Sequence, residues 1–483
     1  MEFFARGLSS AYEAEHVAHL FFPRLNMAKC RPSASQEAVW VSCTAKWVWC
    51  AVRCKQGKAF CKEPYQPDET LEYQVCRMLF CLLRDMTGIA PPWGMLTGVR
   101  PVRLLHDLRR KGLEEEQVKD FFLRRHFVSP QKLALAERIE AHQAPVRAMS
   151  LPRSVSVYIS IPFCPSRCSY CSFVSRTTQQ SGALMEPYVE CLLQEIAQTA
   201  RLIESLHLRL ETIYIGGGTP TAISAAQLRR VMQAVKENFD LSKVREYTVE
   251  AGRPDCTDEE KLALIYELGA TRISINPQTL SDRVLAAIGR KHTAQDILDC
   301  FAAARRVGHR NINMDLIAGL PQDTVQGFAE SLRGVAALEP ENITVHTLTM
   351  KRASNLVIDG EQSPEADAAR MLEACELLDG KNYEPYYLYR QKGTLQNLEN
   401  TGYCKPGFTG LYNVFIMEEL HTILSIGAGG STKLVAPERR IERIFNFKYP
   451  TEYVKDFDRI LEKKEGVRAF YGKFFDLDSE TSG

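Results

Sequence analysis

Residues 158–173 read YISIPFCPSRCSYCSF, with Cys164, Cys168 and Cys171 at C-x3-C-x2-C spacing. They follow the alternating β-branched run 155–161, which predicts that the cysteines lie on a loop leaving a strand. Iron–sulfur clusters usually have four cysteine ligands, so a set of three leaves one iron with an open position. The alternative is three buried structural thiols, because cysteine also packs as a small hydrophobe. Regular spacing serves no purpose in apolar packing, and we therefore expect a [4Fe-4S] cluster.

The composition indicates a globular protein of two to three domains. The chain has 483 residues, of which 45% are hydrophobic and 25% are charged. Lys and Arg total 60 against 59 Asp and Glu, so bulk charge gives no reason to expect nucleic acid or a membrane surface as partner. The sequence shows neither a signal segment nor an apolar run that would span a bilayer, and we expect a cytoplasmic protein without membrane insertion.

The first 150 residues are expected to form a small α+β domain. Alternating residues around 39–41 and 47–49 predict an antiparallel hairpin, and the apolar stripe over 68–86, followed by Gly88, predicts a helix. The cysteines from Cys43 to Cys61 are interpreted as buried thiols, with a second metal site as the alternative. Four arginines lie close together in the sequence: Arg100, Arg103, Arg109 and Arg110. They are interpreted either as ligands for substrate carboxylates or as part of a solvated helix face.

From residue 155 onward, strands and helices alternate, which is typical of a parallel α/β sheet. Six strands predict a partial (β/α)6 barrel over residues 151–350, and residues 351–483 are expected to cover the substrate and end in a helical cap. The predicted strands are 155–161, 212–216, 246–250, 271–276, 311–317 and 343–349, with helices at 184–204, 225–238, 259–268, 324–338 and about 364–379.

Polar residues stand where these strands end, which is where barrels place their chemistry. Gly216, Gly217 and Gly218 let backbone N–H groups approach a ligand. Glu250 ends another strand, and Asp315 lies between apolar neighbours, where a carboxylate is costly without a partner.

The stretch YISIPFC-x3-C-x-Y-C resembles the signature of radical S-adenosylmethionine (SAM) enzymes, in particular the oxygen-independent coproporphyrinogen III dehydrogenase group. The resemblance covers roughly residues 150–435, and residues 1–150 match only the HemZ-like branch of that group. It implies a radical SAM barrel in which the open iron chelates SAM. An electron from the reduced cluster then splits the sulfonium to give a 5′-deoxyadenosyl radical.

The resemblance also implies two SAM sites. Residues carried over to the cluster-bound SAM are Tyr158, Tyr170, Gly217 and Glu250. Those carried over to a second SAM are Gly218, Thr219, Gln278, Arg290, Asp315 and Thr349. For Glu250 and Arg290, an ordinary barrel salt bridge is the alternative.

The activity implied by the resemblance is a radical SAM oxidoreductase of haem biosynthesis. It converts two propionates of coproporphyrinogen III to vinyls and gives protoporphyrinogen IX, with ferredoxin or flavodoxin as electron donor. Phe173 stands where dehydrogenases of the group carry a fourth cysteine, a departure shared with the HemW haem chaperones. The HemW motif H-N-x2-Y-W aligns near residues 411–416 without its His and Trp. The alternatives are therefore a haem-binding chaperone of the HemW type and a radical SAM enzyme acting on another tetrapyrrole.

Overall fold

The computed structural model describes residues 1–483 except 34, 99, 174, 350–366, 392 and 476–483. The chain forms two compact units, one of residues 1–140 with 389–399 and one of residues 141–388 with 400–483. The predicted domain boundary at residue 350, and the start of the helix predicted near 364, lie outside the described residues. Within the described part of the chain, we find no helix long and apolar enough to cross a membrane.

The first unit contains a five-stranded sheet in the order β2-β1-β3-β4-β5. The predicted hairpin is confirmed as antiparallel β3 and β4, and the predicted helix is confirmed as α2, which ends at Gly88 with a left-handed φ of 70°. The elements are β1 (Glu2–Arg6), α1 (Tyr12–His19), β2 (Asn26–Met27), β3 (Ala38–Cys43), β4 (Trp47–Cys54), β5 (Gly57–Pro64), α2 (Leu71–Thr87), α3 (Pro101–Arg110), α4 (Glu115–Lys119) and most of α5 (Pro130–Met149).

The N-terminal cysteines and arginines have structural partners. Cys43 and Cys50 are buried in the apolar core, and burial raises the pKa of Cys43 to about 11, as expected for protonated core thiols. Cys61 lies opposite Cys50 in the β4–β5 ladder. In α3, Arg109 donates to Glu115 at 2.9 Å and to Glu140 at 3.0 Å. These contacts support a structural role for Arg109.

The second unit is built on an eleven-stranded sheet in the order β14-β15-β13-β12-β11-β10-β9-β6-β16-β17-β18. The six predicted strands are confirmed and run parallel as β6, β9, β10, β11, β12 and β13. The strands are β6 (Ser154–Ile161), β9 (Arg209–Gly217), β10 (Glu246–Glu250), β11 (Arg272–Ser274), β12 (Ile312–Ala318), β13 (Asn342–Thr347), β14 (Glu384–Arg390), β15 (Glu399–Cys404), β16 (Thr422–Ile426), β17 (Ser431–Val435) and β18 (Ile441–Phe445).

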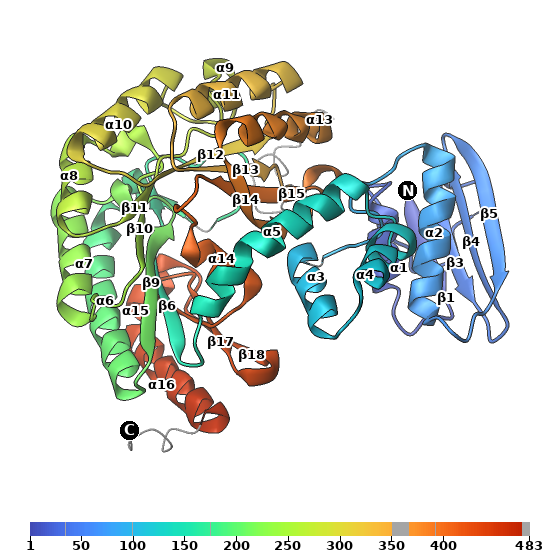
Figure 1. Cartoon of the computed structure of the whole chain (residues 1–483), viewed down its shortest axis with the longest axis horizontal. Coiled ribbons are helices and arrows are strands. Elements are labelled where there is room, and N and C mark those ends of the chain that lie inside the picture. The colour runs from blue at the N-terminus through green and yellow to red at the C-terminus, as the bar shows by residue number, and fades with distance from the viewer. Residues whose placement is uncertain (34, 99, 174, 350–366, 392, 476–483) are drawn as a thin grey trace. The chain divides into compact units, whose positions relative to one another are not determined.

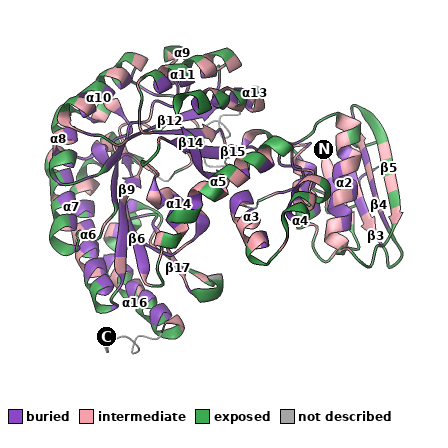
Figure 2. Ribbon diagram, in the orientation of Figure 1, coloured by how far each residue is buried: buried purple, intermediate pink, exposed green. Residues whose placement is uncertain are grey.

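Helices cover the outer face of this parallel sheet, as Figure 1 shows for α6, α7, α8 and α10. Their sequences fix their ends: α10 starts at Thr293, whose side chain accepts from Asp296 N, and stops at Gly308, with φ 119°. Figure 2 shows the strands buried and the outer helix faces exposed. The helices are α6 (Thr178–Ser205), α7 (Ala225–Asn238), α8 (Glu259–Glu267), α9 (Asp282–Ala287), α10 (Ala294–Val307), α11 (Val325–Ala337), α13 (Ala368–Glu373), α14 (Leu411–Glu418), α15 (Pro450–Lys455) and α16 (Phe457–Phe474).

A seventh parallel strand, β16, lies beside β6 and was not among the predicted strands. The glycine loop 427–430 leaves its carboxyl end, and a Cβ on Gly427 would lie 2.6 Å from Ser160 O. A buried carboxylate, Glu195 of α6, secures this loop. It accepts from Gly427 N at 2.8 Å and pairs with Lys464 of α16 at 2.9 Å. The C-terminal helices therefore pack on α6 and stabilise a loop at the carboxyl ends of the parallel strands.

Replacing Glu195 by Gln leaves the buried Lys464 ammonium without its charged partner. Breaking a buried pair in this way costs about 3 kcal/mol, and we expect the free energy of unfolding to fall by that amount. Urea denaturation followed by circular dichroism measures the change. Glu186→Gln is the control, since Glu186 pairs with Arg230 on the surface, and it should leave the stability nearly unchanged. Equal effects of the two substitutions would contradict the role given to Glu195.

Candidate functional site

The three predicted cysteine ligands lie on one loop at the carboxyl end of β6. Cys168 is buried, while Cys164 and Cys171 are half-buried. The loop is closed by the short parallel pair β7 (Phe163–Cys164) and β8 (Arg176–Thr177). Burial raises the pKa of Cys171 to about 11 and also raises the pKa of Cys164, so these two thiols are protonated when no iron is bound. Phe173, where related dehydrogenases have a fourth cysteine, is 67% exposed.

In the described residues, no three His, Cys, Asp or Glu side chains converge on the position of a single metal ion. An iron–sulfur cluster does not require its cysteines to converge on one point, because each thiolate binds a different iron.

The glycine motif lies directly against the cysteine loop. Gly218 N donates to Ile161 O at 2.9 Å, and Thr219 N donates to Phe163 O at 2.8 Å. A Cβ on Gly218 would lie 3.0 Å from Cys164 Sγ, so only glycine permits this approach. Gly217 adopts a left-handed φ of 117°. The predicted residues Gly217, Gly218 and Thr219 are thus brought to the first cysteine.

Tyr170 and Arg290 meet beside the cysteines, although the resemblance assigns Tyr170 to the cluster-bound SAM and Arg290 to the second SAM. Arg290 Nη2 donates to the Tyr170 hydroxyl at 3.1 Å, and Nη1 donates to Asn276 O at 3.1 Å. Arg290 Nε is buried without a hydrogen-bond partner, and so are both ring nitrogens of the nearby His292. Burial, reinforced by Arg290, lowers the pKa of His292 to about 4, which keeps this imidazole neutral. These polar atoms without hydrogen-bond partners are compatible with a polar ligand at this place.

Glu250 lies at the end of β10 among tyrosines. Tyr214 donates to Glu250 Oε1 at 2.7 Å, and the Tyr214 ring stacks on Tyr412 with centroids 4.6 Å apart. Tyr158, another predicted residue, stacks on Tyr214 at 6.0 Å. Burial raises the pKa of Glu250 to about 7, and the charge of Asp315 adds to the effect. Glu250 is therefore poised between its neutral and ionised forms near neutral pH.

Asp315 lies within β12 and has the partners that its position demands. Asn313 Nδ2 donates to Asp315 Oδ1 at 2.7 Å, and His346 Nε2 lies 3.6 Å from Oδ2. Burial alone would raise the pKa of Asp315, but these neighbours hold it below its usual value. The backbone of Gln278, with a left-handed φ of 68°, donates to Asp315 O at 2.9 Å. Asp315 and Gln278 are thus adjacent.

Thr349 follows β13 and donates to Thr347 O at 3.3 Å. That contact does not join it to the other predicted residues, so its place in the site stays a prediction.

Sequence reasoning missed four residues at the carboxyl ends of the parallel strands: Arg253, Asp255, Tyr214 and Tyr412. Arg253 contacts the cysteine loop, with Nη1 3.8 Å from Cys168 Sγ. The available signal was the Arg-Pro-Asp sequence three residues after Glu250, directly beyond a predicted strand end. For Tyr412 the signal was weaker, because its place depends on the packing of α14.

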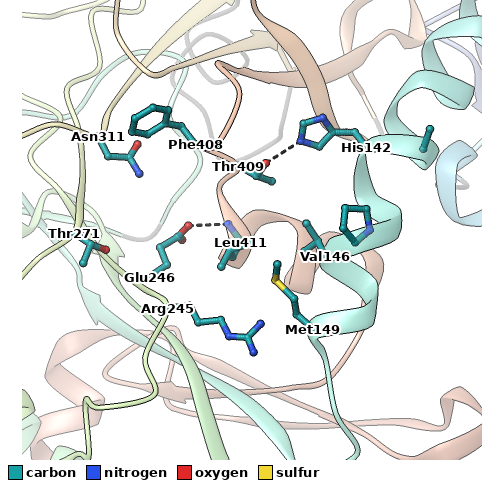
Figure 3. A pocket seen from close by; sticks show the side chains of 13 residues that line it. His142, Val146, Met149, Arg245, Glu246, Thr271, Asn311, Phe408, Thr409 and Leu411 are labelled. Carbon is teal, nitrogen blue, oxygen red and sulfur yellow. Dashed lines mark hydrogen bonds between the residues drawn. The ribbon is translucent and has the colours of Figure 1, made fainter.

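A cavity of about 560 Å³ lies at the opposite edge of the sheet, where Glu246, Thr271 and Asn311 stand at the starts of strands (Figure 3). Its polar groups bond to one another: His142 with Thr409 at 2.8 Å, and Glu246 with Leu411 N at 2.7 Å. Chemistry in such folds belongs to the carboxyl edge, so we place the candidate active site at the cysteines.

The residues at the carboxyl edge fit an iron–sulfur cluster with SAM beside it. One loop offers three thiols, the glycine backbone passes within contact of the first, and Arg290 and His292 present unpaired polar atoms. Two half-buried carboxyl groups, Glu250 and Asp315, lie at the same edge.

The chain is similar to known proteins. Residues 158–334 match the model of the Radical SAM superfamily. The chain is 38% identical over 391 residues to the oxygen-independent coproporphyrinogen-III oxidase-like protein HemZ of Bacillus subtilis, covering 79% of this chain and 78% of that protein. It is 30% identical over 305 residues to the heme chaperone HemW of Haemophilus influenzae, covering 62% of this chain and 76% of that one.

A solved structure, coproporphyrinogen III oxidase (HemN) from Escherichia coli, has the same fold, with a TM-score of 0.52 and 23% identity, over 66% of this chain and 73% of that chain. By its cysteine loop, its parallel barrel and these matches, the chain belongs to the radical SAM superfamily, in the family of the oxygen-independent coproporphyrinogen-III oxidase-like proteins.

Proposed function

We propose that this protein is an oxygen-independent coproporphyrinogen III dehydrogenase. The observation that carries the proposal is the match to the HemZ protein, which extends over 79% of the chain and so well beyond the superfamily core at 158–334. In the proposed reaction, each of two propionates would give one hydrogen atom to the 5′-deoxyadenosyl radical that SAM supplies and one electron to an external electron acceptor, and would release CO2 to become a vinyl group. Ferredoxin or flavodoxin is the proposed electron donor.

Cys164, Cys168 and Cys171 would hold a [4Fe-4S] cluster, and the neighbouring Tyr158, Tyr170, Gly217 and Glu250 would contact the first SAM. When bound, the cluster and SAM supply a radical that removes hydrogen from an unactivated carbon. The protein's own residues position the reactants and exclude water. The rings of Tyr158, Tyr214 and Tyr412 stack beside Glu250.

Glu250 has a specific role in this proposal. An ionised carboxylate accepts hydrogen bonds from ribose hydroxyls or pairs with an ammonium group, whereas the neutral form has lost its charge and part of its acceptor capacity. The groups that face it are the hydroxyl of Tyr214, the rings of Tyr158 and Tyr412, and the Asp315 and His346 pair.

A haem chaperone is the second candidate, favoured by the match to HemW and by Phe173 in place of a fourth cysteine. The segment that aligns with the HemW motif argues against it. In α14, Tyr412 and Phe415 are buried inside the unit, and Asn413 donates to the Tyr386 hydroxyl at 3.0 Å. Phe415 and Asn413 serve packing, Tyr412 faces Glu250, and the His and Trp of the motif are absent. We therefore favour the catalyst.

The pKa of Glu250 predicts how SAM binding varies with pH. The raised pKa, about 7, means that the carboxyl is mostly neutral at pH 6 and mostly ionised at pH 8. We expect the dissociation constant for SAM to be about tenfold larger at pH 6 than at pH 8, as the ionised fraction dictates. Anaerobic equilibrium dialysis of the reconstituted protein measures it. Because titration of SAM itself affects both proteins equally, Glu250→Gln should remove the tenfold difference, and an unchanged pH dependence in that variant would contradict the role of Glu250.

The function itself is tested with reconstituted protein, SAM, dithionite and coproporphyrinogen III under anaerobic conditions. We expect 5′-deoxyadenosine, and protoporphyrin after oxidation, by chromatography. Asp315→Asn should lower vinyl formation by about 100-fold, the usual effect of losing one electrostatic contact in a reaction site, while SAM cleavage continues. The control Asp299→Asn changes an exposed carboxylate of α10.

Deoxyadenosine that is never coupled to vinyl formation, together with stoichiometric haem retained by the protein, would instead support the chaperone. Equal loss of both activities in Asp315→Asn would indicate a structural role for that residue.

A further inference from the structure

A buried arginine, Arg253, joins the cysteine loop to Asp255 through its guanidinium group. The residue is 4% exposed and follows β10 by three positions. A guanidinium has five N–H donors, and each has an acceptor here. Nε donates to Asp255 Oδ1 at 2.9 Å; Nη1 donates to Ser166 O at 2.9 Å and to Cys168 Sγ at 3.8 Å; Nη2 donates to Ser166 Oγ at 2.9 Å and to Asp255 Oδ2 at 2.6 Å.

Three of these contacts reach the cysteine loop, at two residues. Ser166 is held by both its backbone carbonyl and its hydroxyl, and Cys168 by its sulfur. Ser166 lies midway between the first two cysteines, so fixing it restricts the conformations of both ligands. Lysine has three donors on a single nitrogen and cannot reproduce this planar set.

The remaining two contacts join Arg253 to Asp255 in a bidentate pair. Burial alone would raise the pKa of Asp255, but Arg253, with His292 and Arg290 nearby, holds it below its usual value. The pair therefore places one positive and one negative charge behind the loop, with the positive charge nearer to Cys168.

We propose that Arg253, oriented by Asp255, is the positioning residue of the cysteine loop and raises the reduction potential of the cluster bound there. The inference rests on the proposed cluster at Cys164, Cys168 and Cys171. Net charge and hydrogen bonds to cluster sulfurs set the potentials of iron–sulfur centres. Reduction adds negative charge, and an N–H donor and a positive charge at Cys168 stabilise the reduced form. Asp255 has the opposite influence.

The test uses the full-length protein, reconstituted anaerobically, in five forms: wild type, Arg253→Gln, Arg253→Lys, Asp255→Asn and the control Arg306→Gln. Arg306 is an exposed arginine of α10, so its substitution makes the same change of charge at the surface. The midpoint potential is measured by redox titration followed by electron paramagnetic resonance (EPR). The rate of iron loss to a chelator measures how well the cysteine loop retains the cluster.

We expect the two charge changes to move the potential in opposite directions: more negative in Arg253→Gln and more positive in Asp255→Asn. Arg253→Lys should keep a potential near that of the wild type and lose iron faster, because it keeps the charge without the planar donors. Arg306→Gln should change neither quantity. A purely structural role would move both Arg253→Gln and Asp255→Asn in the same direction or leave the potential unchanged.

If Arg253→Gln binds no cluster although its thermal unfolding matches the wild type, the hold on the loop is confirmed, and Arg253→Lys and Asp255→Asn decide the effect on potential. Wild-type potential and wild-type iron loss in Arg253→Gln would overturn the proposal. Failure of the wild type itself to bind a cluster would instead overturn the proposed function.

Discussion

The parallel direction of the central strands is the constraint on which the rest of the structure depends. Because β6, β9, β10, β12 and β16 all run the same way, the segments that follow them meet at one edge of the sheet. The cysteine loop, the glycine motif, Glu250 and the glycine loop 427–430 come from distant parts of the sequence and reach that edge for this reason. The opposite edge, in contrast, is closed by contacts within the protein, such as that of Glu246 with the start of α14.

The surroundings of two carboxyl groups at this edge shift their pKa values in opposite directions. Glu250 is half-buried beside tyrosines, and loss of hydration favours its neutral form, whereas Asp315 is bonded to Asn313 and His346, which favours its ionised form. Pairs of titratable groups whose pKa values are driven apart mark sites where acid and base roles are divided. Here the charge of Asp315 itself helps to raise the pKa of Glu250, so the two positions act on each other.

Local patterns were sufficient to predict the six barrel strands and the cysteine loop, because β-branched runs and cysteine spacing are properties of short segments. The strand predicted at 271–276 is shorter, Arg272–Ser274, since the chain turns away at Asn276 toward Gln278. Neither β16 nor the return of residues 389–399 to the first unit was predicted. That return depends on distant partners: Glu399 accepts from Trp93 Nε1 at 2.7 Å and pairs with Lys132.

The same limit explains the site residues that were missed. An Arg and an Asp two positions apart are common in surface turns, and nothing in the sequence shows that Arg253 is buried against Cys168. Tyr412 reaches Tyr214 only because Glu246 accepts from the first amides of α14. Resemblance to a family supplied the predicted SAM contacts, and the structure supplied the hydrogen bonds and ring contacts around those residues.

We propose that SAM meets a cluster with one open iron at the three-cysteine loop. EPR of the reduced, anaerobically reconstituted protein, with and without SAM, tests this proposal. We expect one cluster signal that SAM alters and that disappears in Cys168→Ala. A signal that SAM leaves unchanged, or one that survives Cys168→Ala, would contradict it.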